Sequence, residues 1–153
     1  MMKNLFYLLI LFSISTNTFA QESMATIMEK RAREMQRVIN LPDKQEWIKF
    51  IKENYTQALI DKQQTMKVVG NENGSTTTSK EEMKETDKLE AKAKMFARLH
   101  EDFSGSKIVS IKSKDENLEM VLNNGDGLTG TFKLKFDKNK PYLIDGIGIE
   151  AGN

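Results

Sequence analysis

The sequence lacks the residues on which most small enzymes depend. Its 153 residues include no cysteine, one histidine and one tryptophan. Without cysteine there is no disulfide framework, no thiolate metal site and no cysteine nucleophile. A catalytic triad or a general base working near neutral pH would have to use the single histidine, His100. Routes to catalysis are therefore few, and stability must come from an ordinary core.

Motifs for cofactors and metals are also missing. The sequence has no glycine-rich phosphate loop and no nucleophile elbow. The run DKNK at residues 137–140 lacks the later acids, the glycine and the terminal glutamate of a calcium loop. Turn chemistry explains the aspartates there and in the other predicted turns. We predict no cofactor and no metal.

The first 20 residues have the pattern of a secretory signal peptide. Lys3 precedes an apolar run at residues 5–12, and small residues at 18 and 20 fit a cleavage site after Ala20. The apolar run is too short for a stable membrane span, although a membrane anchor is the alternative. We predict a secreted or periplasmic protein with no membrane contact after cleavage, and one domain at residues 21–153.

Charge argues against nucleic acid as a partner. The formal net charge is +1, and removal of the segment that carries Lys3 leaves a neutral chain. A nucleic-acid binder would need a clear basic excess.

The last third of the chain predicts four antiparallel strands, at 107–113, 118–123, 128–136 and 142–150. Apolar residues alternate with polar ones in the middle two strands: Leu118, Met120, Leu122, Phe132, Leu134 and Phe136. Such alternation indicates one buried and one solvated face, and the turn NGDG at 124–127 favours a hairpin. We interpret Lys133 and Lys135 on the solvated face as guards against strand aggregation. The buried face needs a cover.

Helices upstream supply that cover. Residues 22–40 form an amphipathic pattern that ends at Leu41-Pro42, and Asp43 begins a second helix whose apolar stripe runs from Trp47 to Ile60. Phe50 lies off that stripe and is expected to be exposed. A third helix, capped by Ser79, ends after Phe103, and residues 66–69 form a short strand or the tail of the second helix. The predicted fold class is α+β, with two to three N-terminal helices packed on a curved four-stranded antiparallel sheet.

This order of elements resembles a known architecture. The segments that carry the resemblance are WIKFIKENY at 47–55, LHEDFSG at 99–105 and IDGIGIE at 144–150. Together they resemble the cone-shaped nuclear-transport-factor-like (cystatin-like) domains. They are similar to accessory domains that precede secreted bacterial serine hydrolases and tail-specific-type peptidases. The resemblance implies a curved sheet wrapped around a long helix. It implies no hydrolase activity, because these are core and turn residues without a catalytic signature.

Two residues suggest a catalytic alternative. His100 falls on the inward stripe of the third helix, and Asp145 shares a strand face with isoleucines if the last strand is regular. A buried carboxylate needs a partner, so an acid/base pair of His100 and Asp145 in a cavity is one hypothesis. In the alternative, His100 is a helix-end residue and Gly146 marks a β-bulge that turns Asp145 outward. We favour the bulge.

A binding pocket is the other hypothesis. Trp47, Tyr55, Phe96 and His100 would line it between helix and sheet, although aromatic residues at helical spacing are more often simple core. We expect an exported, non-catalytic domain that binds a small apolar ligand or a protein partner. The alternatives are the small enzyme described above and a self-associating module, such as a homodimer.

Overall fold

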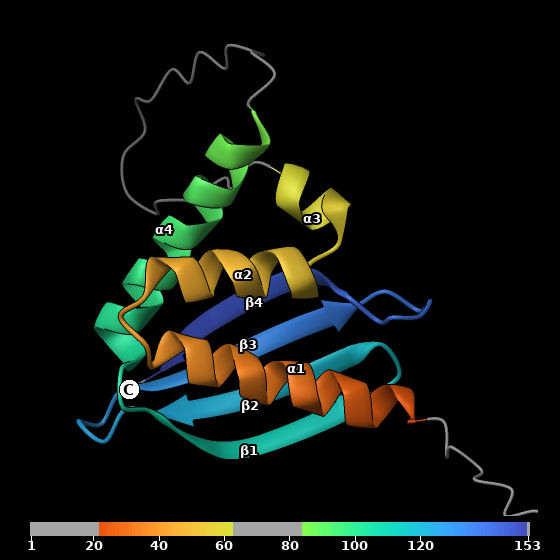
Figure 1. The fold of residues 1–153 in the computed structure, drawn as a ribbon. Helices are drawn as coiled ribbons and strands as arrows, with labels where there is room; N and C mark the ends of the chain where they lie inside the picture. The colour runs from red at the N-terminus through yellow and green to blue at the C-terminus, as the bar shows by residue number, and fades with distance from the viewer. Residues whose placement is uncertain (1–21, 63–83, 153) are drawn as a thin grey trace, which may run out of the picture.

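Four helices precede a four-stranded sheet in the computed structural model, which describes residues 22–62 and 84–152. The helices are α1 (Met24–Ile39), α2 (Lys44–Asn54), α3 (Gln57–Asp61) and α4 (Glu85–Phe103). The strands are β1 (Lys107–Lys114), β2 (Asn117–Asn123), β3 (Thr129–Phe136) and β4 (Ile144–Gly152). They form an open antiparallel sheet in the order β1-β2-β3-β4, with the helices on one face (Figure 1). The predicted α+β fold is confirmed.

Some predictions fall on other parts of the chain. The signal peptide with its cleavage site, Ser79 and the short strand at 66–69 lie outside the described residues. The third helix begins later than predicted, because α4 starts at Glu85 and the preceding Lys84 is extended and serves as its N-cap. Within the two described ranges, no helix combines the length and apolarity needed to cross a membrane.

The alternation in β2 and β3 produces the inner face of the sheet, as predicted. Leu118 pairs with Leu134 and Met120 with Phe132, and all four are at most 2% exposed. Phe96 of α4 is fully buried in the same core, and the ring of Phe103 contacts that of Phe132 edge to face at 5.4 Å. Aromatic edge contacts of this kind add to the hydrophobic gain of burial. The helices and the inner face of the sheet therefore enclose one continuous hydrophobic core.

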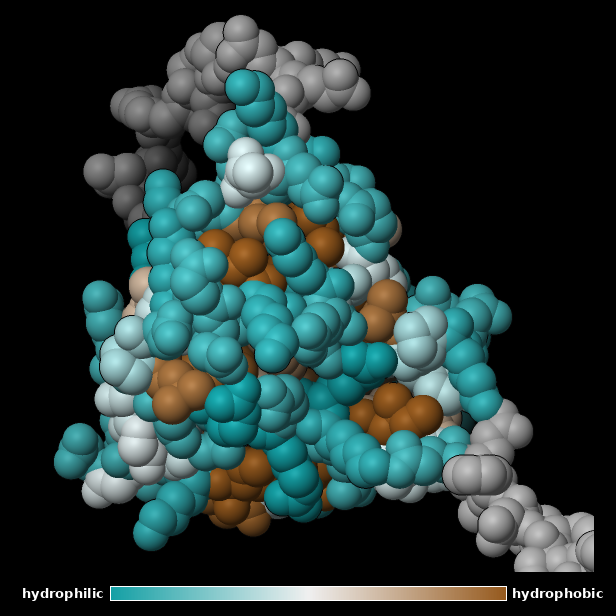
Figure 2. Space-filling model, viewed as in Figure 1, coloured by the Kyte–Doolittle hydropathy of each residue, from teal (hydrophilic) through white to brown (hydrophobic). Residues whose placement is uncertain are grey.

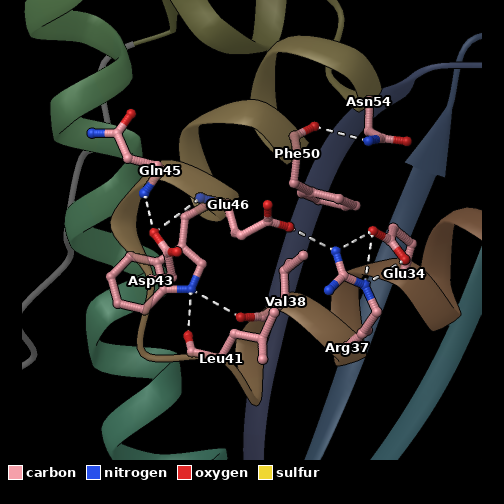
Figure 3. A network of polar contacts seen from close by, with 10 residues as sticks. Glu34, Arg37, Val38, Leu41, Asp43, Gln45, Glu46, Phe50 and Asn54 are labelled. Carbon is pink, nitrogen blue, oxygen red and sulfur yellow. Dashed lines mark hydrogen bonds and ion pairs between the residues drawn. The ribbon is translucent and has the colours of Figure 1, made fainter.

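The corner between α1 and α2 is held by a polar network (Figure 3). The Asp43 carboxylate caps α2 by accepting from the backbone N–H groups of Gln45 at 2.8 Å and Glu46 at 3.4 Å. The Glu46 side chain pairs with Arg37 of α1 at 2.9 Å instead of returning to the cap. The Trp47 indole N–H donates to two carbonyls at the end of α1, those of Val38 and Leu41. The predicted helix start is confirmed, and these contacts tie the two helices together.

The second helix is shorter than predicted. It ends at Asn54, and Tyr55 is extended and forms a parallel bridge with Ile144 of β4. The Thr56 N–H donates to the Ile144 carbonyl at 2.9 Å, and the Thr56 hydroxyl caps α3. The prediction of one helix through Ile60 was wrong because backbone pairing with the sheet interrupts the helical pattern.

Phe50 also departs from the prediction. It is only 2% exposed, with its ring 5.6 Å from that of Phe96 in α4 and 6.0 Å from that of Tyr55. Because α2 packs against both α1 and α4, it buries more than the single stripe that the sequence pattern indicates.

Candidate functional site

The aromatic residues predicted to line a pocket lie in the packed core. Trp47 is 8% exposed, Tyr55 is 2% exposed and Phe96 is fully buried. All three belong to the continuous apolar cluster between the helices and the inner face of the sheet. Their surroundings therefore match the alternative of simple core residues, and their role in ligand binding stays a prediction.

His100 is half-buried at the last turn of α4. Its Nδ1 lies 2.8 Å from the Ile39 carbonyl at the end of α1, and its ring is tilted against that of Trp47 with centroids 6.1 Å apart. A carbonyl can only accept, so this contact places the proton on Nδ1. The geometry joins α4 to the end of α1.

Asp145 lies on a β-bulge, as favoured from the sequence. Phe136 pairs with Ile144 and Lys135 with Gly146, so Asp145 is the extra residue between them. Its side chain is exposed and accepts a hydrogen bond from the Thr56 hydroxyl at 2.8 Å. Because of the bulge, Ile144 and not Asp145 pairs with Phe136 and lies on the inner face.

The structure does not bring His100 and Asp145 together through a hydrogen bond within the described parts of the chain. His100 contacts the end of α1, whereas Asp145 contacts the α2–α3 junction at the opposite end of α2. An acid/base mechanism needs the two groups near one reacting atom. No observation therefore favours the catalytic hypothesis.

The helix side shows no large apolar surface among the residues that Figure 2 colours. Hydrophilic residues cover most of it, and apolar residues show only as separate patches (Figure 2). Surfaces that bind apolar partners usually present one contiguous apolar patch. The helix side therefore offers no such site in this view, and the stronger candidate lies on the other side of the sheet.

The outer face of the sheet has a solvent-open hollow of about 520 Å³. Two rows of outward-facing residues cross the four strands and form its surface. The first row is Lys112, Glu119, Lys133 and Gly148; the second is Lys114, Asn117, Lys135 and Gly146. We call this surface the outer hollow. It owes its shape to register, because each row joins residues that pair directly across neighbouring strands.

Positive charge dominates the outer hollow, since four lysines and one glutamate line it. The Lys133 ammonium donates to Glu150 at 2.7 Å, and this hydrogen bond raises the pKa of Lys133. Lys112, Lys114 and Lys135 have no ion-pair partner among residues 22–62 and 84–152. The outer hollow can therefore accept further negative charge.

On the β4 side of the outer hollow, two glycines leave the backbone without side chains above it. A Cβ added to Gly146 would lie 3.4 Å from Cβ of Lys135, and one added to Gly148 would lie 3.8 Å from Cβ of Lys133. With no side chains on these two residues, the lysine stems border a flat strip of backbone. Backbone exposed in this way permits close approach by another chain.

This surface was not predicted from the sequence, although part of its signal is visible there. Lysines alternate at 112 and 114 and again at 133 and 135, and glycines alternate at 146 and 148. The interpretation of Lys133 and Lys135 as aggregation guards considered β3 alone. Their alignment with β1 and β4 depends on strand register, which a single strand does not reveal.

The remaining polar clusters do not suggest a metal centre. No group of three or more potential metal-ligating side chains occurs in the part of the chain that the structure describes. A second hollow of about 270 Å³ lies between α1 and Asn54. There Arg31 donates to the carbonyls of Glu53 and Pro141, so it connects α1, α2 and the β3–β4 loop.

Comparison with known proteins yields no match among family models, curated proteins or solved structures. The resemblance to nuclear-transport-factor-like domains therefore stays a prediction, and the function must be argued from the chain itself.

Proposed function

We propose that this protein is an exported, non-catalytic binding module that holds an extended acidic segment of a partner protein on its outer hollow. The observation that carries the proposal is the alignment of four lysines in two rows beside a glycine strip. Of the two ligand classes expected from the sequence, a protein partner has more support than a small apolar ligand. The aromatic residues suited to an apolar ligand are already packed against each other.

Spacing supports an extended segment. Lys133 and Lys135 are two residues apart on one strand, which separates their side chains by about 7 Å. An extended peptide repeats its side chains on one face at the same interval, so acids at alternate positions would meet both lysines. Lys112 and Lys114 lie two strands away, about 10 Å across the sheet. They would contact the other flank of the same segment.

The surface suits a peptide better than a single-stranded nucleic acid. Proteins that bind single strands stack bases on aromatic side chains. The residues that line the outer hollow include no aromatic side chain, and Glu119 between Lys112 and Lys133 would oppose a continuous phosphate backbone. A segment with spaced carboxylates avoids that repulsion.

The proposal can be tested with a fluorescent peptide of about ten residues in which glutamate and threonine alternate. We expect anisotropy to show binding that weakens with added salt, because the contacts are exposed ion pairs. Lys135→Glu should weaken binding about tenfold at low salt. The matched control is Lys94→Glu on α4, which makes the same change in net charge on the helix side and should bind as the original protein does.

Two further probes sharpen the result. A peptide with the same composition but with its glutamates in one block should bind more weakly, because it does not match the lysine spacing. An equal loss of affinity for the alternating peptide in Lys135→Glu and Lys94→Glu would contradict a defined binding site. Tighter binding of an oligothymidine of about ten nucleotides than of the alternating peptide would replace the acidic peptide with a nucleic acid.

A further inference from the structure

The two edges of the sheet are protected to different degrees. On β1, the pairing register shifts between Ile108 and Ser110, and this bulge leaves Val109 65% exposed. The same strand carries lysines at 107, 112 and 114. Bulges and lysines are the usual devices that prevent an edge strand from pairing with another chain.

On β4, only the first two residues are covered or bulged, and Glu150 is the one charged residue that follows them. Ile144 is covered by Tyr55 and Thr56, and Asp145 is the bulge. Residues 146–152 then pair with β3 without interruption and include no lysine and no proline. Within the described ranges, no other strand pairs with this segment. Its outer edge is therefore a free pairing surface seven residues long.

The side chains along this edge suit a partner strand. Ile147 and Ile149 point to the inner face and are only partly buried at the margin of the core. An added strand would cover their exposed parts. On the outer face, Gly146 and Gly148 place no side chain in the way.

We propose that a second copy of this chain pairs with β4 in antiparallel orientation about a twofold axis at Ile149. This register pairs Ile149 with its own copy, Gly148 with Glu150 of the second copy, and residue 146 with residue 152. It leaves Ile144 with Tyr55, so neither chain has to open. The contact is isologous and closed, as most homodimer contacts are. The inference differs from the proposed acidic partner in using backbone pairing along the edge of the sheet, although Lys133 and Gly148 belong to both surfaces.

Charge complementarity favours a second copy as the occupant. Lys133 is the β3 neighbour of Gly148, so in this register Glu150 of the second copy lies two strands from it, across the glycine. Two strands span about 10 Å, which extended lysine and glutamate side chains can bridge. Lys133 already contacts Glu150 of its own chain. The dimer would join two such pairs into one four-charge cluster, in which the two Glu150 carboxylates are diagonal neighbours flanked by the two Lys133 ammonium groups, and glycine at 148 leaves room for it.

The test measures the mass of the purified protein by size exclusion with light scattering over a series of concentrations. We expect twice the monomer mass at the highest concentrations. Glu150→Lys and Lys133→Glu should each raise the dimer dissociation constant about tenfold or more, because each places like charges opposite one another. An equimolar mixture of the two variants should dimerise again, because every cross-chain pair is then of opposite sign.

Lys107→Glu is the matched control, since it changes one charge by the same amount on the other edge. It should leave the dimer unchanged. Circular dichroism and thermal unfolding of each variant separate loss of pairing from loss of folding. A wild-type monomer at all concentrations would overturn the proposal. So would a mixture of folded charge variants that stays monomeric, or a dimer that Lys107→Glu disrupts and Glu150→Lys does not.

Discussion

The inner and outer faces of the sheet are built from the same strands under different constraints. On the inner face, the side chains of Phe132 and Leu134 point into the core and are at most 2% exposed. On the outer face of the same strand, Lys133 and Lys135 are exposed and share their rows with glycines. The inner side chains must pack against each other, whereas the outer ones need only be polar enough to face water. The outer face is therefore free to carry recognition.

The largest expected difference between the faces comes from two neighbouring residues of β3. Phe132→Ala removes a fully buried ring whose centroid lies 5.4 Å from that of Phe103. We expect the free energy of unfolding to fall by about 3–5 kcal/mol. Thr131→Ala, one residue away on the outer face, should change it by less than about 0.5 kcal/mol. Urea unfolding followed by circular dichroism measures both. Similar losses in the two variants would mean that the outer face is also packed.

Much of this contrast could be predicted from sequence, because it is local. Alternation within β2 and β3 identified the buried set from Leu118 to Phe136, and the structure confirms it. The bulge at Asp145 was one of two interpretations, since the chemistry of an Asp-Gly pair fits either. The structure decides between them through the pairing of Phe136 with Ile144 and of Lys135 with Gly146.

The features that the sequence did not reveal depend on contacts between distant segments. The break at Tyr55 results from hydrogen bonding of Thr56 to Ile144, 88 positions further along the chain. A helical pattern in the residues on either side of Tyr55 gives no indication of it. The outer hollow likewise needs the register of four strands. Local propensity is overridden where the backbone finds a partner elsewhere in the fold.

A pair of glycines gives an intermediate effect and a sharper comparison. A Cβ on Gly130, on the inner face, would overlap Cζ of Phe103 and lie 2.6 Å from its Cε1. Because Phe103 is itself buried, Gly130→Ala should lower the unfolding free energy by about 1–3 kcal/mol. Gly148→Ala on the outer face meets only Cβ of Lys133 at 3.8 Å and the Lys133 carbonyl at 4.0 Å, and should be neutral or stabilising, by up to about 1 kcal/mol.

Thermal and urea unfolding of the two glycine variants provide the measurement. If Gly148→Ala proved as damaging as Gly130→Ala, the outer face would have a close contact that these distances do not show. The double variant Gly130→Ala with Phe103→Leu serves as the control. It removes the ring that the new methyl group meets, so adding Gly130→Ala to Phe103→Leu should have less effect than adding it to the original chain.

The smallest expected effect concerns titration, in which the two sides of the sheet also differ. On the outer face, a hydrogen bond to Glu150 raises the pKa of Lys133. In the core, burial raises the pKa of the Tyr55 phenol above its usual range, and the hydroxyl has no hydrogen-bond partner among the described residues. An unfolded tyrosine ionises near pH 10. Above that pH the unfolded chain loses a proton that folded Tyr55 keeps, so stability falls as pH rises, by about 1.4 kcal/mol per pH unit.

Urea unfolding between about pH 9 and pH 11 tests this slope. Tyr55→Phe should be as stable as the original chain or more so near neutrality, because it removes a hydroxyl without a partner among the described residues. It should also lose about one proton's worth of pH dependence above pH 10. Lysine titration contributes equally to both proteins, so their difference isolates Tyr55. Identical slopes would show that the phenol ionises in the folded protein, and that the core around Tyr55 is open to water.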